Sequence, residues 1–169
     1  MSLFRETMIT CPACKERFNF DESDSVNGDR RPDLRDAIID GSFQVVPCPS
    51  CAETIRMEPQ FNYLDMGNSL WIAAFPARMM PDFLELEDTA TEVFDDAYGA
   101  NAVPMARTIG ENLDVRLIFG WPAIREKLVL RLAGLERRGP YAEIGRTYDD
   151  LGAIFTTRGL WPQAMELVG

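Results

Sequence analysis

The chain has 169 residues, 46% of them apolar, and its 27 acidic and 17 basic residues give a formal charge of −10. This composition suits one domain with a hydrophobic core, alone or with a small appendage, and excludes a disordered tail. The negative charge disfavours nucleic-acid binding because it repels phosphates, although Arg30, Arg31 and Arg35 could form a small basic patch. The sequence contains no histidine, which excludes catalysis or metal binding by imidazole.

The longest apolar stretch is Leu70–Phe75, which has the length of a strand. No stretch approaches the roughly 18 apolar residues that a membrane-spanning helix needs. Residues 1–10 contain neither a long apolar run nor a small-residue cleavage site of the kind that ends a secretory signal. We therefore expect a cytoplasmic protein, and in that compartment paired cysteines are more often metal ligands than disulfides.

All the cysteines lie in two near-identical stretches, Cys-Pro-Ala-Cys at 11–14 and Cys-Pro-Ser-Cys at 48–51, with 33 residues between them. Two turns of this kind that meet face to face form a tetrahedral site of four sulfurs, which is typical of structural zinc. The sequence thus predicts one structural Zn²⁺ with the ligands Cys11, Cys14, Cys48 and Cys51. A redox pair is the alternative, but it would need a helix start beside it, and neither stretch precedes a helical pattern.

The residue after each second cysteine bears on the shape of these turns. Zinc knuckles often have glycine there, because φ tends to be positive at that position. Lys15 and Ala52 occupy the two positions in this chain. Each turn is therefore either strained or follows a different path.

The first half of the chain reads as short strands around the two knuckles. The predicted strands are residues 3–10, 17–20, 43–46 and 53–58. The polar segment 21–31 is predicted to be a loop. Pro32 is expected to begin a helix, and Gly41 to end it.

The second half alternates strands and helices. Strands at 61–64 and 70–75 are expected to flank a turn at 65–68. The segment 82–96 has seven carboxylates and no base, and Thr89 and Glu92 within it suggest the capping box of a short helix that ends near Gly99. A buried strand at 115–119 should then lead into a long helix.

That last helix is predicted to begin at Pro122 and to end at the Arg-Arg-Gly of 137–139. The resulting fold class is α+β. We expect a zinc-ribbon-like antiparallel sheet, built from two zinc-knuckle hairpins with extra strands, and helices packed at one side. The predicted domains are a zinc-binding domain at 1–139 and a helical hairpin at 140–169.

Beyond the cysteines, several stretches resemble the CpXC family, a group of bacterial and archaeal proteins named for two Cys-Pro-x-Cys motifs. Pro-Asp-Leu at 32–34 and Ile-Asp-Gly-Ser-Phe at 39–43 lead into the second motif as they do in that family. Arg-Leu-Ile-Phe-Gly at 116–120, followed by Arg-Glu-Lys-Leu at 125–128, resembles its C-terminal strand and helix. The similarity extends over residues 8 to 135.

Tyr63, Asp65 and Met66 resemble the Tyr-His-Asp segment of the same family, followed by an aromatic strand that ends at Pro76. The family's histidine before aspartate is replaced by Leu64 in this chain, so any role of that histidine is absent. The resemblance implies a zinc-binding domain, and it implies no particular biochemical activity.

Residues beyond 140 resemble the first two-thirds of a tetratricopeptide repeat. The matching positions are Tyr148, Leu151, Gly152, Phe155, Trp161 and Ala164, with the turn at Gly159. An ordinary amphipathic helical hairpin is the alternative. Because a lone repeat cannot bury its own faces, either the chain is part of a longer protein or the hairpin docks on the zinc domain or on a second subunit.

Taken together, the sequence favours a zinc-binding interaction module that binds a protein partner, or itself, through the C-terminal helices. The alternative is a hydrolase-like enzyme with a carboxylate site around Asp65 and Tyr63, although Asp65 could instead cap the turn at 65–68. Glu53, Glu58 and Asp114 are further carboxylates to consider. An enzyme is the less favoured interpretation, because the chain has no phosphate loop, nucleophile elbow or dinucleotide-binding fingerprint.

Overall fold

The computed structural model describes residues 2–134 and has a mixed α+β fold, the predicted class. The elements are β1 (Leu3–Thr10), β2 (Arg17–Asn27), α1 (Pro32–Asp40), β3 (Val45–Pro47), β4 (Thr54–Arg56), β5 (Phe61–Asp65), β6 (Leu70–Phe75), the 3₁₀ helix η1 (Ala77–Asp82), α2 (Phe83–Ala97), α3 (Pro104–Gly110), β7 (Asp114–Phe119) and α4 (Gly120–Leu132). The chain divides into two compact units after Trp121. All of these strands lie in the first unit.

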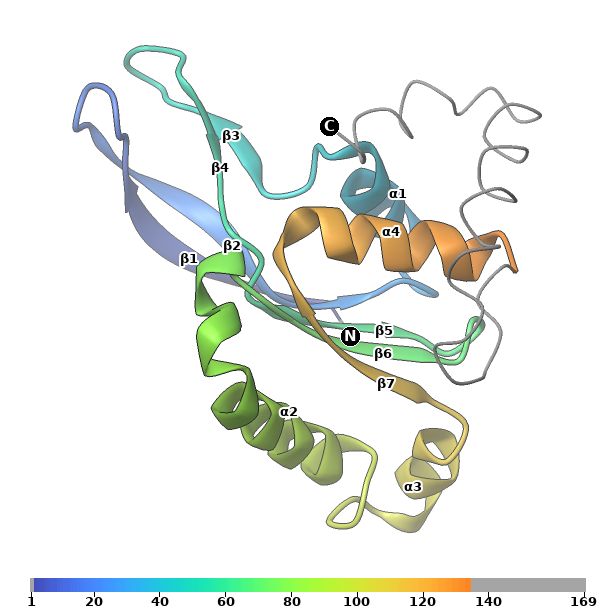
Figure 1. The fold of residues 1–169 in the computed structure, drawn as a ribbon. Helices are drawn as coiled ribbons and strands as arrows, with labels where there is room; N and C mark the ends of the chain where they lie inside the picture. Colours follow the sequence, from blue (N-terminus) through green and yellow to red (C-terminus); the bar gives the residue numbers. More distant parts are fainter. Residues whose placement is uncertain (1, 135–169) are drawn as a thin grey trace. The chain divides into compact units, whose positions relative to one another are not determined.

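Five strands form one sheet in the order β1-β2-β5-β6-β7, and β3 and β4 form a separate two-stranded sheet (Figure 1). The expectation of an antiparallel sheet was wrong. Strands β2 and β5 pair in parallel, as do β6 and β7. The connection between the first pair contains α1 and the β3–β4 hairpin, and that between the second contains α2 and α3. Such long connections carry the chain back along the sheet, so the next strand can run in the same direction.

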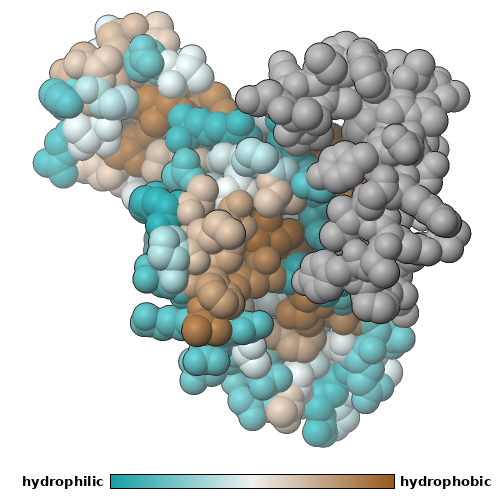
Figure 2. Space-filling view, in the orientation of Figure 1, coloured by the Kyte–Doolittle hydropathy of each residue, from teal (hydrophilic) through white to brown (hydrophobic). Residues whose placement is uncertain are grey.

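The loops at the ends of the β1–β2 and β3–β4 hairpins contain the two Cys-Pro-x-Cys stretches. They extend side by side in Figure 1, although the hairpins belong to different sheets. Their surface carries hydrophilic and hydrophobic residues together (Figure 2). Strand β3 begins at Val45, later than the predicted segment 43–46, because Phe43 and Gln44 lie in a turn. Strand β4 is shorter than the predicted segment 53–58.

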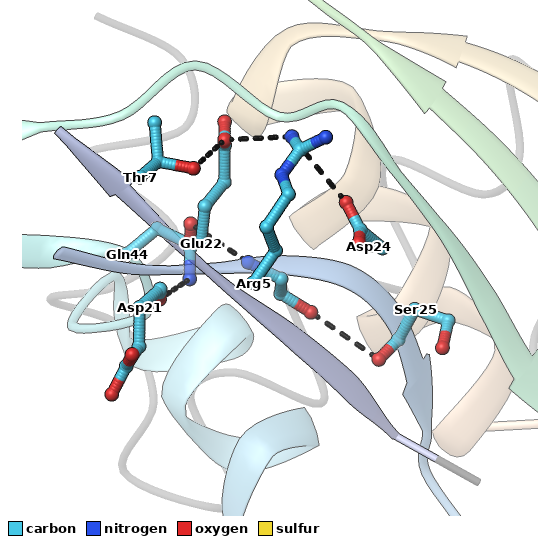
Figure 3. Close-up of polar contacts among 8 residues, drawn as sticks. Arg5, Thr7, Asp21, Glu22, Asp24, Ser25 and Gln44 are labelled. Atoms are coloured by element: carbon cyan, nitrogen blue, oxygen red, sulfur yellow. Dashed lines mark hydrogen bonds and ion pairs between the residues drawn. The ribbon is translucent and has the colours of Figure 1, made fainter.

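Strand β2 continues to Asn27, whereas a loop was predicted from residue 21. Its carboxylates have cross-strand partners, which a prediction from composition does not consider. Arg5 donates a hydrogen bond of 3.0 Å to Glu22, the Thr7 hydroxyl donates another of 3.1 Å, and Arg5 lies 3.5 Å from Asp24 (Figure 3). These contacts let an acidic segment remain in the sheet.

The side chain of Gln44 contacts the edge of β2 that faces away from β1, just before the part of that edge that pairs with β5. The pairing of β2 with β5 begins only at Ser25. Before that, the Ser23 amide donates to Gln44 Oε1 at 3.4 Å, and Gln44 Nε2 donates to the carbonyl of Asp21 at 3.3 Å. The Gln44 carbonyl also accepts from the Met57 amide at 2.9 Å. Gln44 therefore joins the β3–β4 hairpin to the main sheet.

Helix α1 begins at Pro32 and is followed by Gly41 with a left-handed φ of 85°, so both predicted ends are confirmed. Helix α2 is longer than predicted and begins at Phe83. The capping-box prediction was wrong, because Thr89 lies inside α2 and its hydroxyl donates to the Glu85 carbonyl at 3.0 Å. The short helix α3 was not predicted.

Helix α2 packs on one face of the sheet. Leu64, Trp71, Ala73 and Ala90 form a buried cluster there, and the rings of Trp71 and Phe94 meet edge to face with centroids 5.3 Å apart. Alternate residues of a strand point to opposite faces, so Tyr63 and Ile72, which are fully buried, belong to the other face. Both faces of the central strands are therefore covered.

Several predictions concern residues that are not described. The helix predicted from Pro122 corresponds to α4, which is described to Leu132. The tetratricopeptide-like hairpin at 140–169 and the domain boundary at residue 139 lie outside the described residues and stay predictions. Among residues 2–134, no helix has both the length and the apolar character needed to span a membrane.

Candidate metal centre

The first knuckle is a tight turn closed by backbone hydrogen bonds. The Cys11 amide donates to the Glu16 carbonyl at 2.8 Å, and the Lys15 amide donates to the Cys11 carbonyl at 3.0 Å. The first bond continues the β1–β2 ladder beyond its terminal pair, Thr10 and Arg17. The strands thus fix where the turn begins.

The second knuckle repeats this pattern. The Cys48 amide donates to the Glu53 carbonyl at 2.8 Å, and the Ala52 amide donates to the Cys48 carbonyl at 2.9 Å. Lys15 and Ala52 both have positive φ, 65° and 58°. Of the two possibilities left open by the sequence, the structure shows the strained turn in both knuckles.

The four sulfurs lie at the spacing that a metal ion needs. All the Sγ atoms are within 4.8 Å of one another. Cys11 Sγ is 3.7 Å from Cys51 Sγ, and Cys14 Sγ is 3.6 Å from Cys48 Sγ. Metal–sulfur bonds of about 2.3 Å in a regular tetrahedron place the sulfurs about 3.8 Å apart. A disulfide would require about 2.0 Å, and all four cysteines are free thiols.

The first cysteine of each knuckle lies inside and the second lies outside. Cys11 and Cys48 are 0% and 3% exposed, whereas Cys14 and Cys51 are exposed. The ligand set therefore has one side against the protein and one side toward solvent. An ion can reach such a site without displacing a strand.

Hydrogen bonds and contacts within the cluster give Cys11 and Cys51 different pKa values. The Cys14 amide, followed by the Ala13 amide, lowers the pKa of Cys11 to about 7 against the effect of burial. The Glu53 amide acts in the same direction on Cys51, but the neighbouring thiols and burial outweigh it and raise the pKa of Cys51 to about 12. The pKa of Cys14 is also raised. One thiolate therefore forms readily and opposes ionisation of its neighbours, unless a cation compensates the charge.

Asp65 caps the turn between β5 and β6. Its Oδ1 accepts from the Asn68 amide at 3.0 Å, both oxygens accept from Asn68 Nδ2 at 2.9 Å, and Oδ2 accepts from the Tyr63 hydroxyl at 3.1 Å. Asp65 is only 2% exposed. Burial, together with the charge of Asp65, raises the pKa of Tyr63. These contacts are the ones expected for the structural role of Asp65.

The same turn has a second cap, which was not predicted from the sequence. Asp29 lies beyond β2, yet its carboxylate accepts from the amides of Met66 at 2.6 Å and Gly67 at 2.9 Å. Next to it, a Cβ on Gly28 would collide with the hydroxyl of Tyr63. Nothing local to residues 28–29 indicates a partner almost 40 residues away, because the parallel pairing of β2 with β5 creates the contact.

The other candidate carboxylates are not gathered around Asp65. Glu53 and Glu58 are exposed on either side of β4. Asp114 forms an ion pair with Arg116, two residues along β7. Within residues 2–134, the cysteine cluster is the only group of three or more potential ligands close enough to hold a metal ion.

Comparison with known proteins agrees with the motif. The model of the CpXC protein family matches residues 9–139, which is most of the chain. No match was found among curated proteins or among solved structures. The matched residues include both Cys-Pro-x-Cys turns, the end of β1, strands β2 to β7 and the described part of α4. The chain belongs to the CpXC family.

Proposed function

We propose that the protein is an interaction module stabilised by one structural Zn²⁺ bound to Cys11, Cys14, Cys48 and Cys51. The observation that carries this proposal is the close spacing of four sulfurs, all within 4.8 Å of one another, supplied by two turns with the same hydrogen bonds. Four thiolates satisfy zinc and leave no coordination position for a substrate. The proposed role of the ion is therefore structural.

Zinc is favoured over other metals by the chemistry of the ligands. Soft thiolates in a tetrahedral set select zinc or iron and disfavour magnesium and calcium. Zinc has no redox chemistry and no geometric preference that the turns would have to meet. The proposal places the protein in a reducing compartment such as the cytoplasm, where the thiols persist.

The ion would act as a clamp between two sheets. Cys11 and Cys14 lie at the end of the β1–β2 hairpin, and Cys48 and Cys51 at the end of the β3–β4 hairpin. No strand pairing joins these two hairpins. In this sense the region is zinc-ribbon-like: two knuckles share one ion although their strands do not form one ladder.

A binding function is supported over an enzymatic one by the contacts of Asp65. Each of its oxygens accepts from two donors, and the carboxylate is buried. A general base needs access to a substrate proton, and this carboxylate is occupied. The proposal retains the C-terminal helices as a surface for a protein partner or for self-association.

Metal analysis of the full chain tests the proposal. Protein purified without added metal should contain about one zinc per chain, and Cys11→Ser should remove it and lower the melting temperature. Ser50→Ala is the matched control, since it alters the second knuckle without removing a ligand. Bound iron, or a metal content unchanged by Cys11→Ser, would contradict the zinc assignment.

The association surface needs its own measurement. If the chain binds itself, the molecular mass measured in solution should increase with protein concentration. The substitution Trp161→Glu in the full chain should abolish that increase. A mass that is constant over a wide concentration range would exclude self-association. The C-terminal helices would then have to serve a different partner or none.

A further inference from the structure

A hollow beside helix α2, which we call the α2 groove, is lined by residues that do not belong to the metal site. It lies between α2 and strands β5 and β6 and has a volume of about 180 Å³. Pockets for drug-sized molecules measure about 300–1,000 Å³, so the α2 groove takes one long side chain rather than such a ligand.

The floor and one wall of the α2 groove are apolar. The side chains involved include Ala73 and Phe75 of β6 and Ala90 and Val93 of α2. Val93 is 41% exposed, although it is a large apolar residue beside this hollow. An occupant must therefore present an aliphatic surface to the groove.

The rim of the α2 groove is polar and acidic. Thr89 lines it from α2, and Asp24 lines it from β2. Asp24 lies 3.5 Å from Arg5, yet its side chain is 45% exposed and remains accessible. Positions three and four residues away from a helical residue lie on the same side of the helix. Glu85 and Glu92 stand in this relation to Thr89, and both are exposed.

The charge of the surroundings decides what kind of occupant fits. The segment 82–96 contains seven carboxylates and no base, and the whole chain has a formal charge of −10. A second copy of this chain would bring the same acidic helix to the contact. A lysine or arginine from a basic segment matches both features, because its stem is aliphatic and its head is cationic.

We propose that the α2 groove is a docking site for a basic segment of a partner protein, with one lysine or arginine stem on Ala73, Phe75 and Val93. The cationic head then reaches Asp24 and the carboxylates of α2 at the rim. This proposal rests on the interaction function proposed above, but it requires neither the metal nor the C-terminal helices.

The test uses the full chain as purified, with its metal content measured, and a fluorescent decapeptide of alternating arginine and alanine. Binding is followed by fluorescence anisotropy at several salt concentrations, because a charged contact weakens as salt rises. The same peptide with glutamate in place of arginine should not bind. If the arginine peptide does not bind the unaltered chain either, the proposal is wrong.

Two variants and one control separate the groove from general charge. The rim variant Glu85→Gln/Glu92→Gln and the filling variant Val93→Phe should each weaken peptide binding at least tenfold. The control Glu87→Gln/Asp88→Asn changes the net charge by the same amount on other parts of α2, and it should change binding less than twofold. Equal weakening by the control and the rim variant would overturn the proposal.

The outcomes also distinguish this proposal from the metal assignment. If the protein contains one zinc per chain but does not bind the peptide, only the proposal of a docking site at the α2 groove is wrong. If the protein binds the peptide but does not contain stoichiometric zinc, only the proposal of a structural zinc site is wrong. Circular dichroism of each variant checks that α2 remains folded, so that a loss of binding reports on the groove.

Discussion

Lys15 and Ala52 are 37 positions apart in sequence but equivalent in structure. Each follows the second cysteine of its knuckle, each donates its amide to the carbonyl of the first cysteine, and each has a left-handed φ, 65° and 58°. Neither is glycine, for which this conformation is favourable. The two turns therefore hold the same strained shape, and the strain persists because the hydrogen bonds around the cysteines require it.

Relief of this strain is a first prediction. A non-glycine residue in the left-handed region destabilises the folded state by about 1–2 kcal/mol. Glycine avoids this cost, but its greater freedom in the unfolded chain destabilises the folded state by about 0.5–1 kcal/mol. Ala52→Gly should therefore stabilise the protein by roughly 0.5–1 kcal/mol in chemical denaturation. Lys15→Gly is less suitable, because Lys15 Nζ also donates to the Pro12 carbonyl at 2.8 Å.

Ala13→Gly is the control for that experiment, because Ala13 lies in the other knuckle and is not among the residues with positive φ. Glycine there should destabilise the protein by about 0.5–1 kcal/mol. If both substitutions destabilise, the positive φ of Ala52 does not store strain.

Metal binding should release protons. The pKa of Cys14 is raised and that of Cys51 is raised to about 12, so both thiols are protonated near pH 7 in the metal-free protein. Metal coordination requires thiolates. Titration calorimetry in buffers of different ionisation enthalpy should detect the release of at least two protons per zinc, and affinity should increase with pH. A release below one proton would show that the thiols are already ionised.

Asp65→Asn tests the capping role of this carboxylate. The substitution replaces an acceptor oxygen by an NH₂ group that faces the donors of Tyr63 and Asn68. We expect a loss of about 2–3 kcal/mol in the free energy of unfolding. Asp36→Asn is the control, because Asp36 is exposed and pairs with the neighbouring Arg35 alone among residues 2–134, and it should change stability by less than about 0.5 kcal/mol. Unchanged stability of Asp65→Asn would return this residue to the list of catalytic candidates.

The burial of Tyr63 should make the free energy of unfolding depend on pH in the alkaline range. Its pKa is raised above the ordinary tyrosine value of 10.0 in the folded protein, so the unfolded chain loses this proton first. The stability that depends on neutral Tyr63 is complete below pH 10 and decreases as pH rises above it. The loss should approach about 1.4 kcal/mol per pH unit. Denaturation of the wild-type and Tyr63→Phe proteins between pH 9 and 12 measures it as a difference in slope, and equal slopes would contradict the burial.

The local features of this chain could be predicted because local chemistry determines them. Strand β1 has the predicted bounds, α1 begins at Pro32, and Gly41 adopts a left-handed φ after it. The cysteine cluster could also be predicted, since a duplicated Cys-Pro-x-Cys spacing is compatible with few other functions of four cysteines. In each case the residue that allows the prediction lies at the position whose conformation or chemistry it determines.

The features that were missed depend on contacts distant in sequence. The acidic residues of β2 remain in the sheet because Arg5 and Thr7 contact Glu22 from the neighbouring strand. The parallel pairings follow from where the connections return the chain, which composition does not specify. Asp29 caps a turn beyond β5 only because β2 and β5 are neighbours.

The Gln44 amide has a consequence for the way in which an ion would be acquired. Because this side chain joins the β3–β4 hairpin to the edge of β2 without any cysteine, we expect the second knuckle to face the first before an ion arrives. Little chain ordering then remains for the binding step, and the exposed thiols Cys14 and Cys51 can meet the ion first. The rate of uptake should accordingly be limited by loss of water from the ion, and refolding of the polypeptide should not control it.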